Sequence, residues 1–312
     1  MARPFPATIM MKKILLYLSE REAPKKMLTS IALFNNVTKR FVAGETVDEA
    51  SAAIKVLNAK GISATFDHLG EAIRSEEEAT AEVEMYSRIL DRIEADGLDS
   101  NVSLKLTQLG LDIRKEFCIE NLTKIVEHAA KTGNFVRIDM EDSGHLEATL
   151  DVFRAVRAAH DNVGIVIQSY LFRSEQDIRD LLAIGARIRL CKGAYKEPPE
   201  VAFQAKSKVD ANYVALMKIL LPSGIYHGIA THDPAMINAT IRFARDQKLD
   251  QKCFEFQMLY GIARDRQLKL VEEGFNVRVY VPFGRAWYPY FMRRLAERPA
   301  NVLFILRAMV KG

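Results

Sequence analysis

Eight short runs of β-branched and aromatic residues alternate along the chain with segments whose apolar residues recur every three or four positions. The short runs predict strands, and the longer segments, such as EEEATAEVEMYSRILDRIEADG, predict helices. The predicted strands span residues 62–69, 101–106, 135–140, 163–170, 187–193, 227–232, 253–259 and 276–284. Repeated strand-helix units at this spacing predict an α/β fold, a (β/α)8 barrel of the TIM type. An open doubly wound sheet is the alternative, but no GxGxxG follows the first strand to support a dinucleotide fold.

The predicted strands carry polar residues where a parallel sheet covered on both faces is normally apolar. These residues are Lys105, Arg137, Asp139, Gln168, Arg189, Lys192, His232, Glu255 and Gln257. Burying a charge without a partner is costly, and polar groups near the carboxyl ends of barrel strands usually face the active site. We expect Arg137 and Glu255 to form structural ion pairs inside the barrel. We expect function from the residues that lie late in their strands, namely Lys105, Asp139, Arg189 and His232.

Composition and charge narrow the classes of function. The net charge is +4, with 44 basic and 40 acidic residues, and this balance gives no sign of a nucleic-acid partner. Three isolated cysteines and six histidines without metal-ligand spacing predict a reducing compartment and no metal site. The apolar run at residues 14–18 is too short to span a membrane, so we expect a cytoplasmic protein.

The predicted site is rich in cations. Arg293 and Arg294 follow a Tyr-Pro-Tyr-Phe cluster, and two converging guanidinium groups favour a carboxylate or a phosphate. A solvated basic helix face is the alternative for this pair. The sequence has no Walker lysine and no recognisable nucleophile triad, and Cys191 is expected to be a small core residue. Two mechanisms stay open: a Schiff base on Lys105 or Lys192, or cations that hold an anionic cofactor and substrate together.

Five motifs carry a family resemblance. They are RLCKGAY (189–195), ATHDP (230–234), FEFQMLYG (254–261), YVPFG (280–284) and YPYFMRRLAERPANV (288–302). In this order and spacing they resemble proline dehydrogenases, both the monofunctional bacterial enzymes and the corresponding module of bifunctional proline-utilisation proteins. The resemblance begins near residue 30 and is strongest from SLKLTQLG (103–110) onward. Because no aldehyde dehydrogenase domain follows, the chain looks like the monofunctional form.

The resemblance implies a distorted (β/α)8 barrel that binds FAD over the carboxyl ends of its strands, with the last helix over the barrel. It implies oxidation of L-proline to Δ1-pyrroline-5-carboxylate by hydride transfer from proline C5 to flavin N5, with a membrane quinone as electron acceptor. The family's 4-hydroxyproline oxidisers are similar and carry a smaller residue at the position of Tyr280, so the resemblance favours proline.

Site residues are also implied by the resemblance. Lys105, Arg293 and Arg294 would hold the proline carboxylate, and Asp139 would orient Lys105 or a tyrosine. The substrate ring would be enclosed by Tyr195, Leu259, Tyr280 and Tyr290. Arg189 would lie beside flavin N5, where it stabilises negative charge on the reduced ring. The remaining flavin contacts would come from Gln168, Cys191, Lys192, Gly193, Ala194, Thr231, His232, Gln257 and Glu297. The family usually has Val at the position of Cys191.

The ends of the chain are expected to act around this site. Glu71 resembles the glutamate that pairs with the first arginine of the Arg293–Arg294 pair and closes a gate over the substrate. Residues 1–60 resemble the helical arm that precedes the barrel (residues 61–312), with a role in packing, oligomer contact or membrane docking. The apolar segments 14–18 and 302–310 are candidates for membrane contact, with core helices as the alternative. Homo-oligomerisation stays open, as do two other functions: a Schiff-base lyase, and a catalytically silent binding or regulatory barrel.

Overall fold

Eight parallel strands close into a barrel in the order of the sequence, because β1 pairs with both β2 and β8. The computed structural model describes residues 40–70 and 73–297, without the side chains of residues 293–297. The strands are β1 (Ser63–His68), β2 (Ser100–Leu104), β3 (Val136–Ile138), β4 (Val163–Gln168), β5 (Arg187–Cys191), β6 (His227–Ala230), β7 (Phe254–Leu259) and β8 (Asn276–Phe283). All eight predicted strands are confirmed, and the open doubly wound sheet is excluded.

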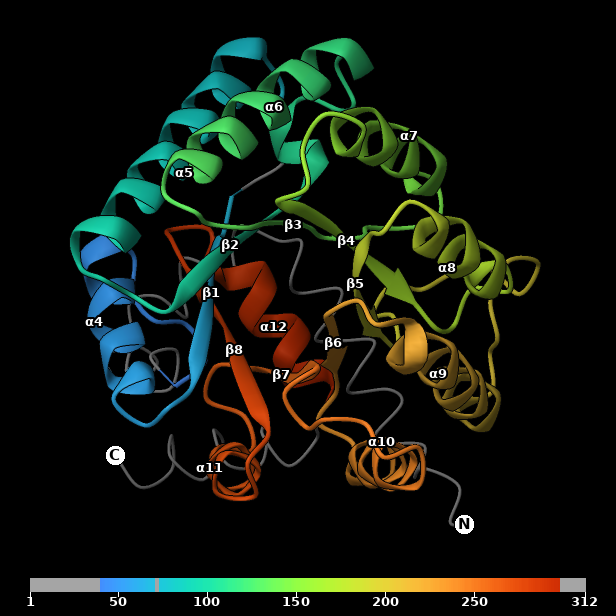
Figure 1. Cartoon of the computed structure of the whole chain (residues 1–312). Helices are drawn as coiled ribbons and strands as arrows, with labels where there is room; N and C mark the ends of the chain where they lie inside the picture. Colours follow the sequence, from blue (N-terminus) through green and yellow to red (C-terminus); the bar gives the residue numbers. More distant parts are fainter. Residues whose placement is uncertain (1–39, 71–72, 298–312) are drawn as a thin grey trace, which may run out of the picture.

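A helix follows every strand, and most of these helices form a ring around the barrel (Figure 1). The helices are α5 (Glu76–Ala95), α6 (Lys115–Lys131), α7 (Leu146–Arg157), α8 (Ser174–Ala183), α9 (Lys206–Leu220), α10 (Pro234–Asp246), α11 (Arg264–Glu272) and α12 (Trp287–Glu297). Two 3-10 turns, η1 (Leu106–Leu109) and η2 (Leu221–Ser223), complete the connections. The fold is therefore the predicted TIM-like α/β barrel.

Local signals in the sequence start several helices. The Ser75 side chain accepts a hydrogen bond from the Glu78 amide at the start of α5. Asp233 caps α10 in the same way, with Pro234 in the first turn, where its missing N–H costs nothing. Such caps satisfy amide groups that have no acceptor inside the helix.

The described part of the predicted arm is α4 (Val47–Asn58), which packs against β1 and β8. Thr46 and Glu49 form a reciprocal capping box at its start. Ala50 and Ile54 are fully buried in the main core of the barrel. The helix is therefore part of the barrel's packing, whereas residues 1–39 lie outside the described residues and the division at residue 60 stays a prediction.

Alternation within each strand separates an apolar face from a polar one. In β7, Phe254, Phe256 and Met258 belong to the core, whereas Glu255 and Gln257 between them take part in polar contacts. Successive side chains of a strand point to opposite faces, so the polar groups face the barrel interior. The apolar positions that predict the strands thus form the outward face of the barrel, which the helices cover.

The last helix departs from the outer ring. Figure 1 shows α12, in red, across the middle of the ring of strands in that view. Trp287 and Phe291 of α12 pack in a second apolar cluster with Phe41, Leu69 and Ile262. Because Leu69 follows β1 and Ile262 follows β7, this cluster places α12 at the carboxyl end of the barrel.

His227 makes folding stability sensitive to pH. Its Nδ1 accepts the Ile188 amide at 3.1 Å, so the neutral ring carries its proton on Nε2, which lies 2.9 Å from Ser223 Oγ. Burial and the nearby Arg137 charge lower the pKa of His227 from 6.5 to about 3. The unfolded chain therefore binds this proton between pH 6.5 and pH 3, and the folded chain does not. The stability that His227 contributes is present above pH 6.5 and is lost as the pH falls towards 3.

We predict that His227→Gln weakens the pH dependence of unfolding. In the wild type this histidine removes about 2 kcal/mol of unfolding free energy between pH 6.5 and 5, at about 1.4 kcal/mol per unit. Urea denaturation at several pH values measures the slope, and His160→Gln, at a partly exposed histidine, is the control. Equal slopes in wild type and His227→Gln would contradict the assignment.

Candidate active site

Charged and polar side chains from five strands meet at the carboxyl end of the barrel. The contributors are Asp67 of β1, Lys105 after β2, Asp139 after β3, Arg189 of β5 and Tyr280 of β8. Parallel strands bring their carboxyl ends to one edge of a barrel, so residues far apart in sequence become neighbours there. Of the residues predicted to be catalytic, the structure brings Lys105, Asp139 and Tyr280 together, with Arg189 from the predicted flavin set.

Asp139 accepts hydrogen bonds from three side chains. Its Oδ1 lies 2.7 Å from Arg189 Nη1 and 2.7 Å from Ser103 Oγ, and its Oδ2 lies 2.6 Å from the Tyr280 hydroxyl. Charge-assisted hydrogen bonds of this kind are short and strong. Asp139 therefore fixes the positions of Arg189 and Tyr280 relative to each other.

The tyrosine in this group is a neutral donor. Burial and the adjacent Asp139 carboxylate raise the pKa of Tyr280 well above its usual value. The Arg189 guanidinium also lies 5.3 Å from the centre of the Tyr280 ring, within the range of a cation–π contact. Tyr280 thus presents an uncharged ring beside a cation.

Lys105 pairs with Asp67, whose carboxylate lies 3.4 Å from its Nζ. Burial acts to lower the pKa of Lys105, but the charges of Asp67 and Asp139 outweigh burial and raise it. The amine is therefore a cation at neutral pH. A Schiff-base lysine needs a neutral amine, so this environment disfavours that chemistry and favours binding of an anion.

A second group of charges surrounds Lys192 beyond β5. The Lys192 ammonium bonds the carboxylates of Asp210 and Asp233, and Lys206 bonds the same two carboxylates. These cations and the cap of α10 hold the pKa of Asp233 at about 2, although burial acts to raise it. The predicted flavin residue Lys192 is thus already neutralised by protein carboxylates.

Most of the remaining predicted flavin residues lie along β4, β5 and the segment after β6, whereas Gln257 lies in β7 and Glu297 in α12. Gln168 ends β4 and donates to the Glu141 carbonyl at 3.1 Å. Burial raises the pKa of the Cys191 thiol to about 11, so this cysteine is not a thiolate at neutral pH. His232 Nε2 accepts the Leu259 amide at 2.8 Å, and Thr231 Oγ1 accepts the Asp233 amide at 3.0 Å.

The backbone position that follows Lys192 requires glycine. Gly193 has φ of +103°, and a Cβ built there would lie 2.5 Å from the Tyr170 ring. No other residue type fits that backbone without displacing the tyrosine. The neighbouring Ala194 and Tyr195 are exposed at the surface.

The residues predicted to contact substrate from the end of the chain are placed only in part. Leu259 ends β7 and packs against the apolar cluster of α12, in which Tyr290 is buried. Arg293, Arg294 and Glu297 belong to α12, but their side chains lie outside the described residues. Glu71 and the apolar segments 14–18 and 302–310 also lie outside the described residues.

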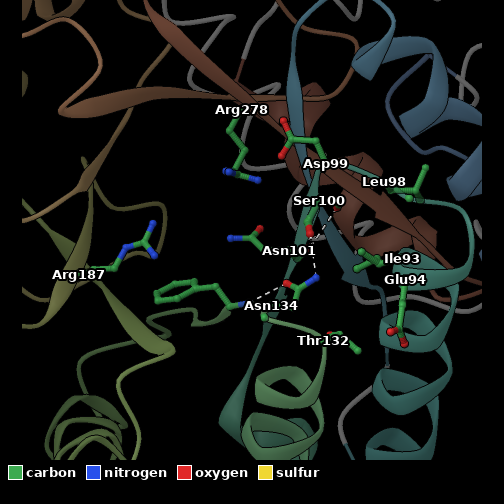
Figure 2. Close-up of a pocket in the computed structure, with 13 residues that line it drawn as sticks. Ile93, Glu94, Leu98, Asp99, Ser100, Asn101, Thr132, Asn134, Arg187 and Arg278 are labelled. Atoms are coloured by element: carbon green, nitrogen blue, oxygen red, sulfur yellow. Dashed lines mark hydrogen bonds between the residues drawn. The ribbon is translucent and has the colours of Figure 1, made fainter.

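A cavity of about 410 Å³ opens at the opposite, amino end of the barrel (Figure 2). Asn101, Arg187 and Arg278, which stand near the starts of β2, β5 and β8, surround it. Among the described residues that line this cavity, none belongs to the predicted site. Residues 40–70 and 73–297 contain no group of three His, Cys, Asp or Glu side chains that could hold a metal ion.

Sequence analysis missed two residues of the site. Asp67 neutralises Lys105, and Ser103 bonds both Asp139 and Arg189. A carboxylate near the end of the first predicted strand was a usable signal for Asp67. Ser103 gave no signal, because an inward serine in a strand is common and its partners come from other strands.

Of the two residues expected to form structural ion pairs, Glu255 does so and Arg137 does not. Glu255 pairs with Arg278 at 2.8 Å, as an interior ion pair. Arg137 instead donates to the carbonyl groups of Ile165 and Arg187. Carbonyl oxygens take the place of a carboxylate at Nη1, and the buried Nε has no hydrogen-bond partner in the described part of the chain, so sequence-based pairing by charge fails there.

Comparison with known proteins extends over most of the chain. The model of the family described as "Proline dehydrogenase" matches residues 50–307. The chain belongs to the proline dehydrogenase family. Proline dehydrogenase 2 of Bacillus subtilis (strain 168) is 45% identical over 272 residues, which cover 87% of this chain and 90% of that protein. Proline dehydrogenase of Deinococcus radiodurans is 40% identical, over 89% of this chain and 91% of that protein.

Solved structures of larger proteins share the barrel. Proline utilization A (PutA) from Bdellovibrio bacteriovorus, crystallised after inactivation by N-propargylglycine, matches with a TM-score of 0.82 and 26% identity. The match covers 93% of this chain and 37% of the PutA chain, so this chain spans little more than a third of that protein. Bifunctional PutA of Escherichia coli (strain K12) is 30% identical over 86% of this chain and 24% of that protein.

We predict that Asp139→Asn is strongly destabilising. The Arg189–Asp139 pair is only 8% and 15% exposed, and asparagine leaves a buried guanidinium without its carboxylate. Removing one partner of such a pair costs about 3 kcal/mol or more. Urea denaturation at pH 7 measures the loss. Glu147→Gln, in an exposed pair with Arg173, should cost less than about 1 kcal/mol. Equal losses in the two variants would refute the central role of Asp139.

Proposed function

We propose that this protein oxidises L-proline to Δ1-pyrroline-5-carboxylate with FAD as its cofactor and a quinone as the electron acceptor. Membership of the proline dehydrogenase family supports the substrate. The observation that carries the proposal is that one carboxylate, Asp139, holds a guanidinium and a phenol beside a cationic lysine at the carboxyl end of a family barrel. A cofactor and an anionic substrate both require such fixed positive groups.

The residues present fit a flavin. The Oε1 atom of Gln168 is buried and accepts no hydrogen bond from the described part of the chain, so it is available to an N–H of the flavin ring. Gly193 lets the backbone after β5 pack closely against the Tyr170 ring, which occupies the space that a side chain would need. Arg189 supplies a fixed cation. We assign the flavin ring to Gln168 and Arg189, and the dinucleotide to the segment from Lys192 to Ala194 with Thr231, His232 and Glu297.

Each residue then has a defined role. When bound, FAD supplies hydride acceptance from proline C5. Lys105 holds the substrate carboxylate, together with Arg293 and Arg294, because its ammonium keeps its proton beside Asp67. Tyr280 forms one wall of the substrate pocket, and its hydroxyl is held by its hydrogen bond to Asp139. Arg189 favours negative charge on its ligand, since Asp139 and Tyr280 hold it in place beforehand.

The alternatives are weaker. A Schiff-base lyase would need Lys105 or Lys192 as a neutral amine, but each lies against carboxylates. A catalytically silent barrel is disfavoured by the intact Lys105, Asp139, Arg189 and Tyr280 group. Oxidation of 4-hydroxyproline would need space that the bulky Tyr280 ring fills, so we assign proline as the preferred substrate.

We propose that this protein is cytoplasmic and contacts the membrane surface peripherally, because its quinone acceptor lies in the membrane. No helix within residues 40–70 and 73–297 is long and apolar enough to cross a bilayer. Homo-oligomerisation stays a prediction, as does a gate formed by Glu71 and Arg293.

We predict that the purified protein is yellow and that anaerobic L-proline bleaches its flavin absorption, whereas 4-hydroxyproline bleaches it weakly or not at all. Visible spectroscopy before and after each addition is the test. Stronger bleaching by 4-hydroxyproline than by L-proline would mean that 4-hydroxyproline is the preferred substrate. A colourless protein that takes up no FAD on reconstitution would overturn the proposal, and borohydride trapping with substrate would then test Lys105.

A further inference from the structure

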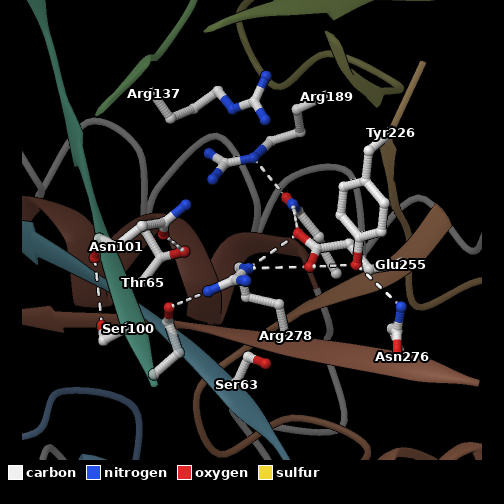
Figure 3. A network of polar contacts seen from close by, with 12 residues as sticks. Ser63, Thr65, Ser100, Asn101, Arg137, Arg189, Tyr226, Glu255, Asn276 and Arg278 are labelled. Atoms are coloured by element: carbon white, nitrogen blue, oxygen red, sulfur yellow. Dashed lines mark hydrogen bonds and ion pairs between the residues drawn. The ribbon is translucent and has the colours of Figure 1, made fainter. Parts of the chain in front are cut away.

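One side-chain amide inside the barrel joins two charged groups. Gln257 of β7 accepts a hydrogen bond from Arg189 Nε at its Oε1 and donates from Nε2 to Glu255 Oε1 at 2.5 Å. Glu255 in turn accepts from Arg278 Nε at 2.8 and 3.0 Å. The four residues Arg278, Glu255, Gln257 and Arg189 form what we call the interior network. Figure 3 shows Arg278, Glu255 and Arg189 beside Tyr226 and Asn276.

Charge alone fixes the orientation of the Gln257 amide. An arginine can only donate hydrogen bonds, so Gln257 must turn its oxygen towards Arg189. An ionised carboxylate can only accept, so Gln257 must turn its NH2 group towards Glu255. The two neighbours therefore select the same orientation, and a flipped amide would lose both hydrogen bonds.

Glu255 stays ionised although it is buried. Burial acts to raise its pKa, but the Arg278 charge and its hydrogen bonds prevail, and the pKa of Glu255 is lowered. The second carboxylate oxygen accepts the Tyr226 hydroxyl at 3.1 Å. The acceptor that orients Gln257 is therefore present at neutral pH.

A glycine keeps Gln257 in place. Gly228 of β6 pairs with Glu255 in the sheet, and a Cβ built on it would lie 2.4 Å from Gln257 Nε2. The amide thus occupies the space that a side chain on β6 would fill. Packing and hydrogen bonding together leave Gln257 one arrangement.

Two sets of contacts then aim Arg189. Gln257 holds its Nε from one side, and Asp139 with Ser103 holds Nη1 from the other. Within the described part of the chain Arg189 donates hydrogen bonds from Nε and Nη1, which leaves Nη2 as the donor for a ligand. A guanidinium fixed at two of its three nitrogens cannot rotate without breaking a buried bond.

We infer that Glu255 and Gln257 are positioning residues, which aim the Arg189 guanidinium at the cofactor from within the barrel. The inference rests on the proposed function, because it takes Arg189 as the flavin-facing cation. Glu255 makes no direct hydrogen bond to Arg189 and reaches it through Gln257. The interior network thereby links Arg278, beside the amino-end cavity, to the cation at the carboxyl end.

The test compares two substitutions with a matched control. Glu255→Gln offers Gln257 an amide in place of a carboxylate, so the Gln257 orientation is no longer unique. Gln257→Met removes the acceptor of Arg189 Nε but leaves the Glu255–Arg278 ion pair intact, which protects the test if Glu255→Gln fails to fold. Thr65→Val is the control, because the Thr65 hydroxyl donates to Asn101 at 2.5 Å inside the same barrel and forms no hydrogen bond with a residue of the interior network.

The readouts are the flavin reduction potential, the rate constant of flavin reduction by L-proline under anaerobic conditions, and the apparent Kd for L-proline. In both network variants we expect a more negative potential and a reduction rate constant lower by about tenfold or more. The Kd for proline should stay within about twofold, because Lys105 is untouched. Thr65→Val should lose thermal stability but keep the wild-type potential and rate constant.

Two outcomes would overturn the inference. One is a folded Gln257→Met protein with the wild-type potential and rate constant. The other is an equal loss in Thr65→Val, which would make the effect one of stability alone. Failure of the wild type to bind FAD or to be reduced by proline would instead reject the proposed function, and with it any flavin role for Glu255.

Discussion

A charge inside a closed barrel is stable only where other groups of the barrel pair with it or form hydrogen bonds to it, and this requirement organises the described interior of the protein. Desolvation of an unpaired ion costs several kcal/mol, which is a large fraction of the unfolding free energy of a typical domain. Asp139 therefore accepts hydrogen bonds from Arg189, Tyr280 and Ser103, and Asp67 forms an ion pair with Lys105. The same contacts that remove this cost fix the geometry of the site.

The barrel accommodates these groups because its strands separate two faces. The outward face is apolar and packs under the helices, so folding stability does not depend on the interior residues alone. The inward face carries the charges, and Gly164 and Gly228 leave the space that Arg137 and Gln257 fill. A fold with this division can change its interior chemistry without losing its outer core, which accounts for the wide use of such barrels.

Periodicity in the sequence predicts the eight strands and their helices, because apolar outward positions recur at fixed intervals. It also predicts that Lys105, Asp139 and Arg189 converge, since each stands late in its strand. It does not predict partners. The pairing of Lys105 with Asp67, of Glu255 with Arg278, and of Arg137 with carbonyl groups depends on strand register and side-chain length, which no local pattern encodes. The roles of Arg293, Arg294, Glu297 and Glu71 rest on family resemblance and stay predictions.

The central claim is that Asp139 and Gln257 hold Arg189 as one unit. A double-mutant cycle of Asp139→Asn and Gln257→Met, measured on the rate constant of flavin reduction by L-proline, tests it most directly. If the two residues act through the same guanidinium, the second substitution should cost much less once the first is made, with a coupling of at least about 1 kcal/mol. Effects that add to within about 0.5 kcal/mol would contradict the account, because they would mean that the two contacts act independently.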